Sequence, residues 1–451
     1  MVDAMFTVEK ITQIVEGELL RSESISPLRA IHDSRLVQPG DLFVALPGRR
    51  SDGHRHIGEA FDAGACAVLA SNTHALPSAA RNVIVVKSPA LALQQLAAAW
   101  RDTLDATFIA VTGSNGKTTV KALLGHLLAR TQETYVAPGN YNTEIGLPIA
   151  LLAMPPSARC GVFELGAEQP GDIATLANIL KPHIGVISSV GPSHLDGFET
   201  IAAVVTEKCS LAEALPTDGT IVINANSPLL LDRMANQTRS VISAGLDAGD
   251  IRGHVAKSVP SLTLVVQGRD CTIDCPLVGE HNAVNVLLAA ATAHLVGMDW
   301  PSIAAQAASF QPIPHRLTPI ESSFGTILDD TYNANPASMI AALRVLSDFG
   351  DATTKRVFVF GDMLGLGIET DAFHRSILRQ ALELSIDAIL PVGERARAAC
   401  MAVNDPRILR LPRDGIVAFV REQSTAFTVF LVKGSRALHL ETLVEELAQE
   451  T

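Results

Sequence analysis

The sequence lacks an excess of positive charge and any long uninterrupted apolar run. Its 451 residues carry a formal net charge of −12, which argues against nonspecific nucleic-acid binding, because such binding needs a basic surface. No stretch reaches ~18 consecutive apolar residues, so we expect no membrane span. The opening residues Met-Val-Asp-Ala-Met-Phe contain no basic segment followed by an apolar run. We therefore expect no secretory signal and a soluble, cytoplasmic protein.

Cysteines and aromatic residues are also scarce. Aromatic residues make up 4% of the chain, and the six cysteines are scattered. Only Cys271 and Cys275 are close, in a C-x-x-x-C spacing that no second pair accompanies. This spacing disfavours a structural zinc site, and strand residues in a reducing compartment are the preferred interpretation.

What is present is an apolar, Ala/Leu/Val-rich composition, with 47% hydrophobic and 18% charged residues. Such a composition is typical of a globular enzyme, and the length suggests about two to four domains. We predict an α/β protein of three domains, with boundaries at residues 1–86, 87–313 and 314–451.

The N-terminal segment, 1–86, alternates short apolar runs with turns and predicts a small α/β domain. The central segment, 87–313, predicts a parallel sheet covered on both sides, because its strands are apolar throughout and helices separate them. Gln311-Pro-Ile-Pro-His315 is a proline-punctuated hinge, and the last segment predicts a second doubly wound α/β unit. The expected strands are 41–46, 65–70, 82–86, 108–112, 161–165, 184–188, 220–224, 326–330, 356–360, 386–390 and 428–432, and the expected helices are 57–64, 91–104, 118–130, 204–214 and 282–296.

The stretch Gly113-Ser114-Asn115-Gly116-Lys117-Thr118-Thr119 follows a buried strand and opens a helix. Backbone N–H groups and the helix dipole favour an anion there. We predict a phosphate loop in which Lys117 neutralises the β- and γ-phosphates and Thr118 holds Mg²⁺. The common pattern has a further glycine where this chain has Val111, and a glycine-rich turn with a solvated lysine is the alternative.

Several polar residues follow the next strands of the same predicted sheet, where ligands of α/β proteins bind. Glu164 ends a strand and suits a Mg²⁺ ligand, with a structural cap as the alternative. His194 follows the next strand, and Lys208 lies on the helix after it; core or surface positions are their alternatives. The polar loop from Asn140 through Asn142 to Pro148 is either a functional loop or an ordinary turn cluster.

Polar groups also collect at the start of the helix from Asn282 and in the C-terminal segment. Asn282 could be an N-cap, as part of Gly279-Glu-His281-Asn282-Ala-Val-Asn285. The C-terminal segment contributes His315-Arg316, Asp329-Asp330-Thr-Tyr332-Asn333-Ala-Asn335 and Lys433-Gly-Ser435-Arg436. Cations that cluster in an acidic protein favour an anionic substrate or a phosphate-bearing intermediate.

Taken in order, five motifs resemble those of the Mur ligase family over essentially the whole chain. They are Thr-Gly-Ser-Asn-Gly-Lys-Thr-Thr, Glu-Leu-Gly-Ala, His-Leu-Asp-Gly-Phe, Gly-Glu-His-Asn-x-x-Asn and Asp-Asp-Thr-Tyr-Asn-Ala-Asn-Pro-x-Ser-Met. The last motif, with Phe-Gly-Asp362-Met and Val-Lys433-Gly-Ser-Arg436, most resembles the branch that adds D-alanyl-D-alanine. The Asp-Asn-Pro-Arg motif of the branch that adds diaminopimelate is absent.

The resemblance implies an N-terminal UDP-binding domain, a central ATPase domain and a C-terminal Rossmann-like domain. It also implies ATP and Mg²⁺ as cofactors, and UDP-N-acetylmuramoyl-tripeptide and D-alanyl-D-alanine as the molecules that are joined through an acyl phosphate. We expect a monomer with a role in peptidoglycan synthesis.

The resemblance further implies roles for single residues. Thr118 and Glu164 would hold one Mg²⁺, His194 would help to hold a second, and Lys208 would be carbamylated to supply an oxygen ligand. Asn282 and Asn285 would lie near the adenine, Arg316 would reach the γ-phosphate and Asp330 the ribose. The predicted substrate contacts are Ser34, Arg35, Asn140, Asn142, Tyr332, Asn333, Asn335, Lys433, Ser435 and Arg436.

Other functions stay open at this point. Another amino-acid-adding Mur ligase or a folylpolyglutamate-type synthetase would share the loop and the metal residues. A P-loop ATPase or kinase would turn over ATP without an acceptor amine, and a silent nucleotide-binding partner is the third alternative. One departure from the family is Gly365, where a glutamate is frequent.

Overall fold

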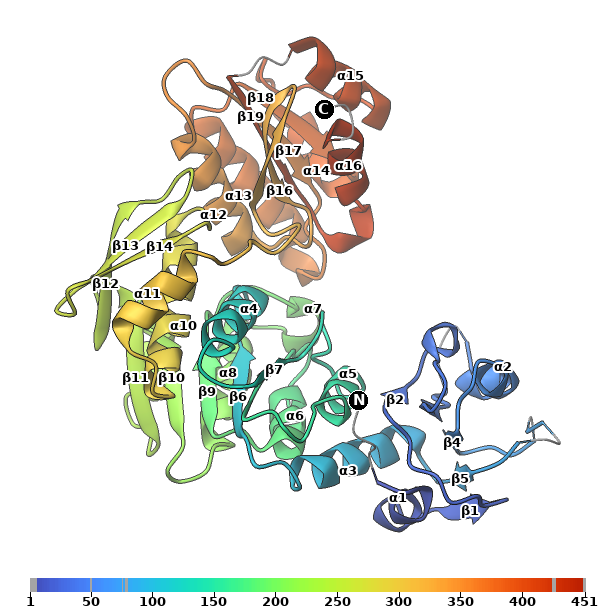
Figure 1. Ribbon diagram of the computed structural model, residues 1–451. Helices are drawn as coiled ribbons and strands as arrows, with labels where there is room; N and C mark the ends of the chain where they lie inside the picture. Colours follow the sequence, from blue (N-terminus) through green and yellow to red (C-terminus); the bar gives the residue numbers. More distant parts are fainter. Residues whose placement is uncertain (1–5, 49–50, 75, 78–79, 424–426, 449–451) are drawn as a thin grey trace.

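The computed structural model describes residues 6–48, 51–74, 76–77, 80–423 and 427–448. Three β-sheets follow one another along the chain, each with its own helices (Figure 1). This arrangement confirms the predicted three-domain α/β fold, while the exact boundaries at 86 and 313 stay predictions. The stretch Met1–Met5, on which the expected lack of a secretory signal partly rests, lies outside the described residues.

The N-terminal sheet has five short strands in the order β1-β5-β4-β3-β2, and only the β1–β5 pair is antiparallel. The three predicted strands are confirmed in shorter form. Two edge strands, β1 and β2, were missed because two or three residues are too few for a periodic pattern. The elements are α1 (Val8–Ile14), β1 (Glu18–Leu20), β2 (Ala30–Ile31), η1 (Ser34–Leu36), β3 (Leu42–Val44), η2 (Gly53–His56), α2 (Ile57–Asp62), β4 (Ala67–Ala70) and β5 (Val83–Val85).

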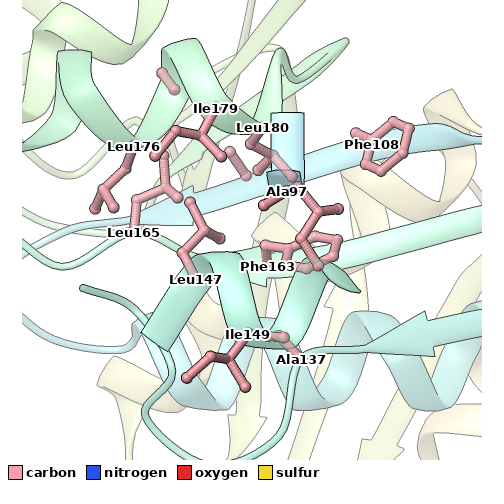
Figure 2. Packing of buried hydrophobic residues seen from close by; sticks show 14 of the residues in the cluster. Ala97, Phe108, Ala137, Leu147, Ile149, Phe163, Leu165, Leu176, Ile179 and Leu180 are labelled. Carbon is pink, nitrogen blue, oxygen red and sulfur yellow. The ribbon is translucent and has the colours of Figure 1, made fainter. Parts of the chain in front are cut away.

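Helix α3 (Pro89–Arg101) connects the first two domains and is part of one continuous core. The Ser88 hydroxyl caps its first turn, and Pro89 occupies a first-turn position that needs no donor. Its buried face packs in a cluster that runs from Val8 in the first domain to Phe163 in the second. Figure 2 shows the part of this cluster around Phe163. The two domains are therefore joined by apolar packing as well as by the helix that connects them.

The central sheet is parallel only in part. Its order is β14-β13-β12-β11-β10-β9-β6-β8-β7, and β13 and β14 are antiparallel. The prediction of a parallel sheet is right from β7 to β12 and wrong for this extension, where buried and exposed residues alternate along the strands. Its strands are β6 (Thr107–Thr112), β7 (Thr134–Val136), β8 (Cys160–Glu164), β9 (Ile184–Ile187), β10 (Thr220–Asn224), β11 (Ser240–Leu246), β12 (Ile251–Lys257), β13 (Leu262–Val266) and β14 (Cys271–Cys275).

The helices that follow α3 in the central domain include three that were predicted and several that were not. Helix α10 is buried along most of its length and packs on β10 to β13 and on α4. Cys271 and Cys275 lie in β14 as strand residues, and the six cysteines are free thiols. The helices are α4 (Lys117–Leu128), α5 (Gly146–Leu152), α6 (Asp172–Leu180), α7 (Leu195–Phe198), α8 (Ile201–Glu213), α9 (Pro228–Met234), α10 (Glu280–Leu295) and α11 (Trp300–Ala307).

The C-terminal sheet has the order β15-β16-β19-β17-β18, parallel except for the β15–β16 hairpin. Its strands are β15 (Thr318–Ser322), β16 (Gly325–Asp330), β17 (Lys355–Gly361), β18 (Ala388–Val392) and β19 (Thr428–Lys433), with helices α12 (Pro336–Asp348), η3 (Gly367–Glu369), α13 (Thr370–Glu383), α14 (Glu394–Met401), α15 (Arg413–Gln423), η4 (Arg436–Leu438) and α16 (Glu441–Ala448). In the part of the chain that is described, no helix has the length and apolar character that a membrane span requires.

Candidate active site

A four-residue loop, Gly113 to Gly116, joins strand β6 to helix α4. Gly113 has φ +145° and Gly116 has φ +83°. A Cβ atom at Gly113 would lie 2.2 Å from the Ser188 hydroxyl oxygen, and one at Gly116 would lie 2.4 Å from the side-chain oxygen of Asn285. Both positions therefore require glycine. The strand, loop and helix are in the arrangement that a phosphate loop needs.

Lys117 folds back over this loop. Its Nζ donates a hydrogen bond to the carbonyl oxygen of Gly113 at 2.7 Å. Burial lowers the pKa of Lys117, while the nearby Glu164 opposes this shift and Arg316 adds to it. An anion bound at the loop would favour the charged ammonium, because opposite charge offsets the cost of burial.

Glu164 stands at the end of β8 beside Thr118 and is 3% exposed. Its carboxylate accepts hydrogen bonds from the Thr118 hydroxyl at 2.9 Å and from the Asn142 amide at 2.8 Å. Burial alone would raise the pKa of Glu164, but Lys117, Lys121 and these two bonds bring it below its usual value. An ionised carboxylate next to a hydroxyl suits Mg²⁺, which prefers oxygen ligands.

The protein supplies few other donors for a metal ion. Within the described ranges, no group of three or more His, Cys, Asp and Glu side chains is placed to hold a metal. The pair Thr118 and Glu164 fits Mg²⁺ because this ion keeps several waters and takes further ligands from substrate phosphates. The donor set therefore agrees with a Mg²⁺–nucleotide complex better than with a metal held by protein alone.

His194 and Lys208 lie close enough to Lys117 of the loop for its charge to act on both. Lys208, on α8, is 2% exposed, and its Nζ makes a long hydrogen bond of 3.4 Å to the Ala167 carbonyl oxygen. Burial, with a further effect of Lys117, lowers the pKa of Lys208 to about 7. Burial also lowers the pKa of His194, and Lys117 and Lys208 act in the same direction. Both side chains thus tend toward their neutral forms. A neutral imidazole can ligate a metal, and a neutral amine can react with an electrophile.

Arg316 reaches the phosphate loop from the C-terminal domain. Its Nη2 donates a hydrogen bond to the Thr118 hydroxyl oxygen at 2.9 Å. The guanidinium carbon lies 3.9 Å from the centre of the Tyr332 ring, and that of Arg436 lies 6.0 Å from the same centre. The aromatic face holds Arg316 in place through a cation–π contact. The structure therefore brings a cation from the third domain to the loop, and the predicted contact of Arg316 with the γ-phosphate stays a prediction.

The polar residues at the ends of β16 and β19 also meet, but they satisfy one another. Lys433 is 1% exposed, and its Nζ lies 2.6 Å from the Asp330 carboxylate and donates to the Asn333 carbonyl oxygen at 2.9 Å. The Ser435 hydroxyl accepts a hydrogen bond from the Leu364 N–H at 2.9 Å. The charge of Lys433 is thus balanced within the domain.

Asn282 and Asn285 lie on the first turns of α10, next to the loop. The N-cap of α10 is Gly279, so the alternative interpretation of Asn282 as the N-cap is wrong. The Asn282 amide donates to the Val278 carbonyl oxygen at 2.9 Å, and the Asn285 amide donates to the Asn282 side-chain oxygen at 2.9 Å. Their predicted contact with adenine stays a prediction.

Some predicted site residues have only local contacts. Ser34 and Arg35 lie on η1 of the N-terminal domain, where Arg35 pairs with Asp33 at 2.6 Å and Ser34 donates to Glu59 at 3.3 Å. Asn140 is exposed. Arg436 pairs with Glu441 at 3.1 Å. The predicted roles of these residues in substrate binding are untested by these contacts.

One buried cation at this site, Lys121, was not expected from the sequence. Lys121 on α4 is 4% exposed, and its Nζ donates to the carbonyl oxygens of Ala137 and Gly139, both at 2.7 Å. It therefore holds the segment that leads to Asn142, whose amide donates to Glu164. Its spacing of four residues from Lys117 was the available signal, because such residues share a helix face.

Comparison with known families and proteins agrees with this geometry. Three family models match consecutive parts of the chain: the Mur ligase family catalytic domain at residues 31–101, the Mur ligase middle domain at 111–293 and the Mur ligase glutamate ligase domain at 315–436. The UDP-N-acetylmuramoyl-tripeptide–D-alanyl-D-alanine ligase of Escherichia coli K12 is 33% identical over 98% of both chains. The chain belongs to the Mur ligase family.

Solved structures of Mur ligases have the same fold. A crystal structure of MurF from Acinetobacter baumannii covers 99% of both chains with a TM-score of 0.89 at 29% identity. A MurF ligase from Thermotoga maritima in complex with ADP covers 94% of this chain and 97% of its own, with a TM-score of 0.83 at 27% identity. The predicted Mur ligase resemblance is confirmed, and with it the three-domain architecture.

Proposed function

We propose that this Mur ligase joins D-alanyl-D-alanine to UDP-N-acetylmuramoyl-tripeptide in an ATP-dependent reaction that builds a peptidoglycan precursor. The observation that carries this proposal is the meeting of Arg316 with Thr118 and Glu164 at the phosphate loop. The E. coli relative that matches along 98% of the chain has this reaction in its name. A nucleotide at this loop would be clamped between two domains, as carboxylate activation by ATP requires.

The chemistry follows from the charges that meet at the loop. A carboxylate oxygen of the tripeptide attacks the γ-phosphorus of ATP, and the bond to the β-phosphate oxygen breaks to release ADP. Both reacting groups are anionic, so cations must reduce their repulsion. We assign this role to Lys117 and Arg316. The amine of D-alanyl-D-alanine then attacks the acyl phosphate, loses a proton and expels inorganic phosphate, which leaves a peptide bond.

The metal ion belongs to this proposal. Mg²⁺ would supply charge stabilisation at the phosphates, with Thr118 and Glu164 as its protein ligands. His194 and a carbamylated Lys208 would hold a second ion. With a pKa near 7, a substantial share of this amine is neutral at neutral pH and can react with CO₂ as a nucleophile, which supports the assignment of Lys208.

The remaining predicted contacts complete the proposal. We assign Ser34 and Arg35 to the UDP moiety, and Asn282, Asn285 and Asp330 to the nucleoside of ATP. Asn140, Asn142, Tyr332, Asn333, Ser435 and Arg436 are assigned to the peptide substrates, with Lys433 beside them. Because ATP and a UDP-linked precursor are cytoplasmic metabolites, we place the enzyme in the cytoplasm. A monomer remains our expectation for its oligomeric state.

The reaction can be tested directly. The protein is incubated with ATP, Mg²⁺ and UDP-N-acetylmuramoyl-tripeptide, with and without D-alanyl-D-alanine. We expect phosphate release that depends on the dipeptide and a pentapeptide product by mass spectrometry. Phosphate release that is independent of the dipeptide, with no pentapeptide, would favour a P-loop ATPase or kinase and refute the ligase.

Arg316 is expected to matter for turnover more than for folding. Arg316→Ala removes the donor to Thr118 and the cation that the third domain brings to the phosphates. We expect kcat to fall about 100-fold, as when a single transition-state donor is deleted. Steady-state kinetics of product formation check this value. Arg344→Ala, at an exposed position of α12, is the matched control, and an Arg316→Ala variant with kcat within threefold of the wild type would contradict the role.

A further inference from the structure

Two asparagine side chains from different domains hold each other across the site. Asn115 lies in the phosphate loop, and Asn335 lies 220 residues later in the C-terminal domain. The Asn335 amide nitrogen donates to the Asn115 side-chain oxygen at 2.7 Å, and the Asn115 amide nitrogen donates to the Asn335 side-chain oxygen at 3.3 Å. The two amides thus form a reciprocal pair of hydrogen bonds.

Each asparagine is fixed to its own domain by other contacts. The backbone N–H of Asn115 donates to the Ser189 hydroxyl oxygen at 2.8 Å, and that hydroxyl donates back to the Asn115 carbonyl oxygen at 3.0 Å. Asn335 is the N-cap of α12: its side-chain oxygen accepts from the Ser338 N–H at 3.0 Å, and its own N–H donates to the Ser338 hydroxyl oxygen at 3.0 Å. The pair therefore forms only when the two domains meet in this arrangement.

The position of the pair gives it a link to the chemistry. Asn115 is two residues before Lys117, so a shift of the loop moves both. Asn335 follows Tyr332, whose ring holds Arg316. A neutral pair also aligns the two domains without competing for the cations that the phosphates need. A second contact across the same domain junction is the hydrogen bond of 3.0 Å from the Leu195 N–H to the Gly365 carbonyl oxygen.

We propose that the pair Asn115–Asn335 couples the shape of the phosphate loop to docking of the C-terminal domain. Asn335 is then a positioning residue, which acts through Asn115, and this role replaces the substrate contact that the family resemblance implied for it. The loop in its phosphate-binding shape presents the Asn115 amide, and docking of α12 onto that amide brings Arg316 to Thr118. The inference rests on the proposed function, because it assumes that ATP occupies the loop.

The variant Asn335→Ser tests this coupling. Serine keeps the N-cap of α12 but is too short to reach Asn115. We expect the melting temperature to stay at the wild-type value. The Kd for ATP of the enzyme without other substrates should stay within twofold of the wild type, because the domains need not be docked in that complex. We expect kcat to fall fivefold to fiftyfold, as the loss of two neutral hydrogen bonds predicts. Asn404→Ser, at an exposed position of the same domain, is the matched control.

A double-mutant cycle and a measurement of closure complete the test. Asn115→Ser combined with Asn335→Ser should lower kcat no further than the more harmful single change. Small-angle scattering should show a decrease in the radius of gyration when a non-hydrolysable ATP analogue and the UDP-tripeptide are added, and a smaller decrease for Asn335→Ser.

Additive effects in the cycle, an unchanged kcat, or a Kd for ATP that rises as much as kcat falls would each overturn the coupling. A wild-type enzyme that forms no pentapeptide would instead refute the proposed function, and the scattering experiment would still report on the pair.

Discussion

Lys117→Ala is expected to lower kcat/KM for ATP about 10²- to 10³-fold, a loss of about 3–4 kcal/mol in transition-state stabilisation. Lys117 is the cation of the phosphate loop, and its ammonium is held at the loop by a hydrogen bond of 2.7 Å to Gly113. Transfer of the γ-phosphoryl group to a carboxylate brings two anions together, so loss of this cation affects the barrier directly. Steady-state kinetics of phosphate release in the presence of D-alanyl-D-alanine measure the effect.

Two measurements separate this effect from unfolding. Lys257→Ala changes an exposed lysine of β12 and should keep turnover near that of the wild type. Thermal unfolding of Lys117→Ala should show a melting temperature no lower than that of the wild type, because burial disfavours the charged ammonium when no phosphate is present. A folded Lys117→Ala variant with turnover within threefold of the wild type would show that the loop does not take part in the reaction.

Lys208→Ala is expected to lower kcat about 100-fold, and short carboxylates such as acetate or formate should restore part of the activity. The reason is that a carbamate on Lys208 would place an oxygen ligand at the second metal, and loss of a group that supports a metal typically costs 10- to 100-fold. A small carboxylate fits the space that the shortened side chain leaves. Turnover measured against carboxylate concentration checks this expectation, and a folded variant that no carboxylate rescues would count against the carbamate.

The carbamate also predicts a pH dependence. Only the neutral amine reacts with CO₂, and the pKa of Lys208 lies near 7 because the side chain is buried. Wild-type enzyme prepared without CO₂ should therefore regain more activity from added bicarbonate at pH 8 than at pH 6. ¹³C NMR with labelled bicarbonate should show a carbamate signal that Lys208→Ala lacks. Equal recovery at both pH values, with no such signal, would contradict the modification.

Lys208→Met provides the control for folding. The pKa of Lys208 is about 7 in the native state, where the side chain is buried, and about 10.5 in the unfolded chain, where it is solvated. Between these values the unfolded state binds more protons, so this lysine makes the wild type more stable as the pH rises. At pH 6 the buried ammonium is charged and disfavoured, so Lys208→Met should be at least as stable as the wild type there while it lacks the activity.

Local sequence patterns predicted much of the fold and the members of the site. The buried strand 108–112, the glycine-bounded turn and the helix that begins at Lys117 appear as expected, because each depends on short-range preferences that glycine and apolar periodicity reveal. The antiparallel strands β13 and β14 were missed for the opposite reason. Their pattern of alternating burial becomes clear only in the folded domain, where β13 packs against α10 and β14 packs against α11.

The sequence by itself determined the reactive groups: a phosphate loop, a carboxylate at the end of a strand and cations in the last domain, since residue type decides which ions a group can hold. Only the tertiary structure decided which of these groups meet. In the folded protein Arg316 donates to Thr118, and Lys433 pairs with Asp330. Asn115 and Asn335 pair across the domains. Burial brings the pKa of Lys208 to about 7. Contacts between residues far apart in the chain, and the burial of a side chain, depend on how the domains pack. The order of residues does not show that packing directly.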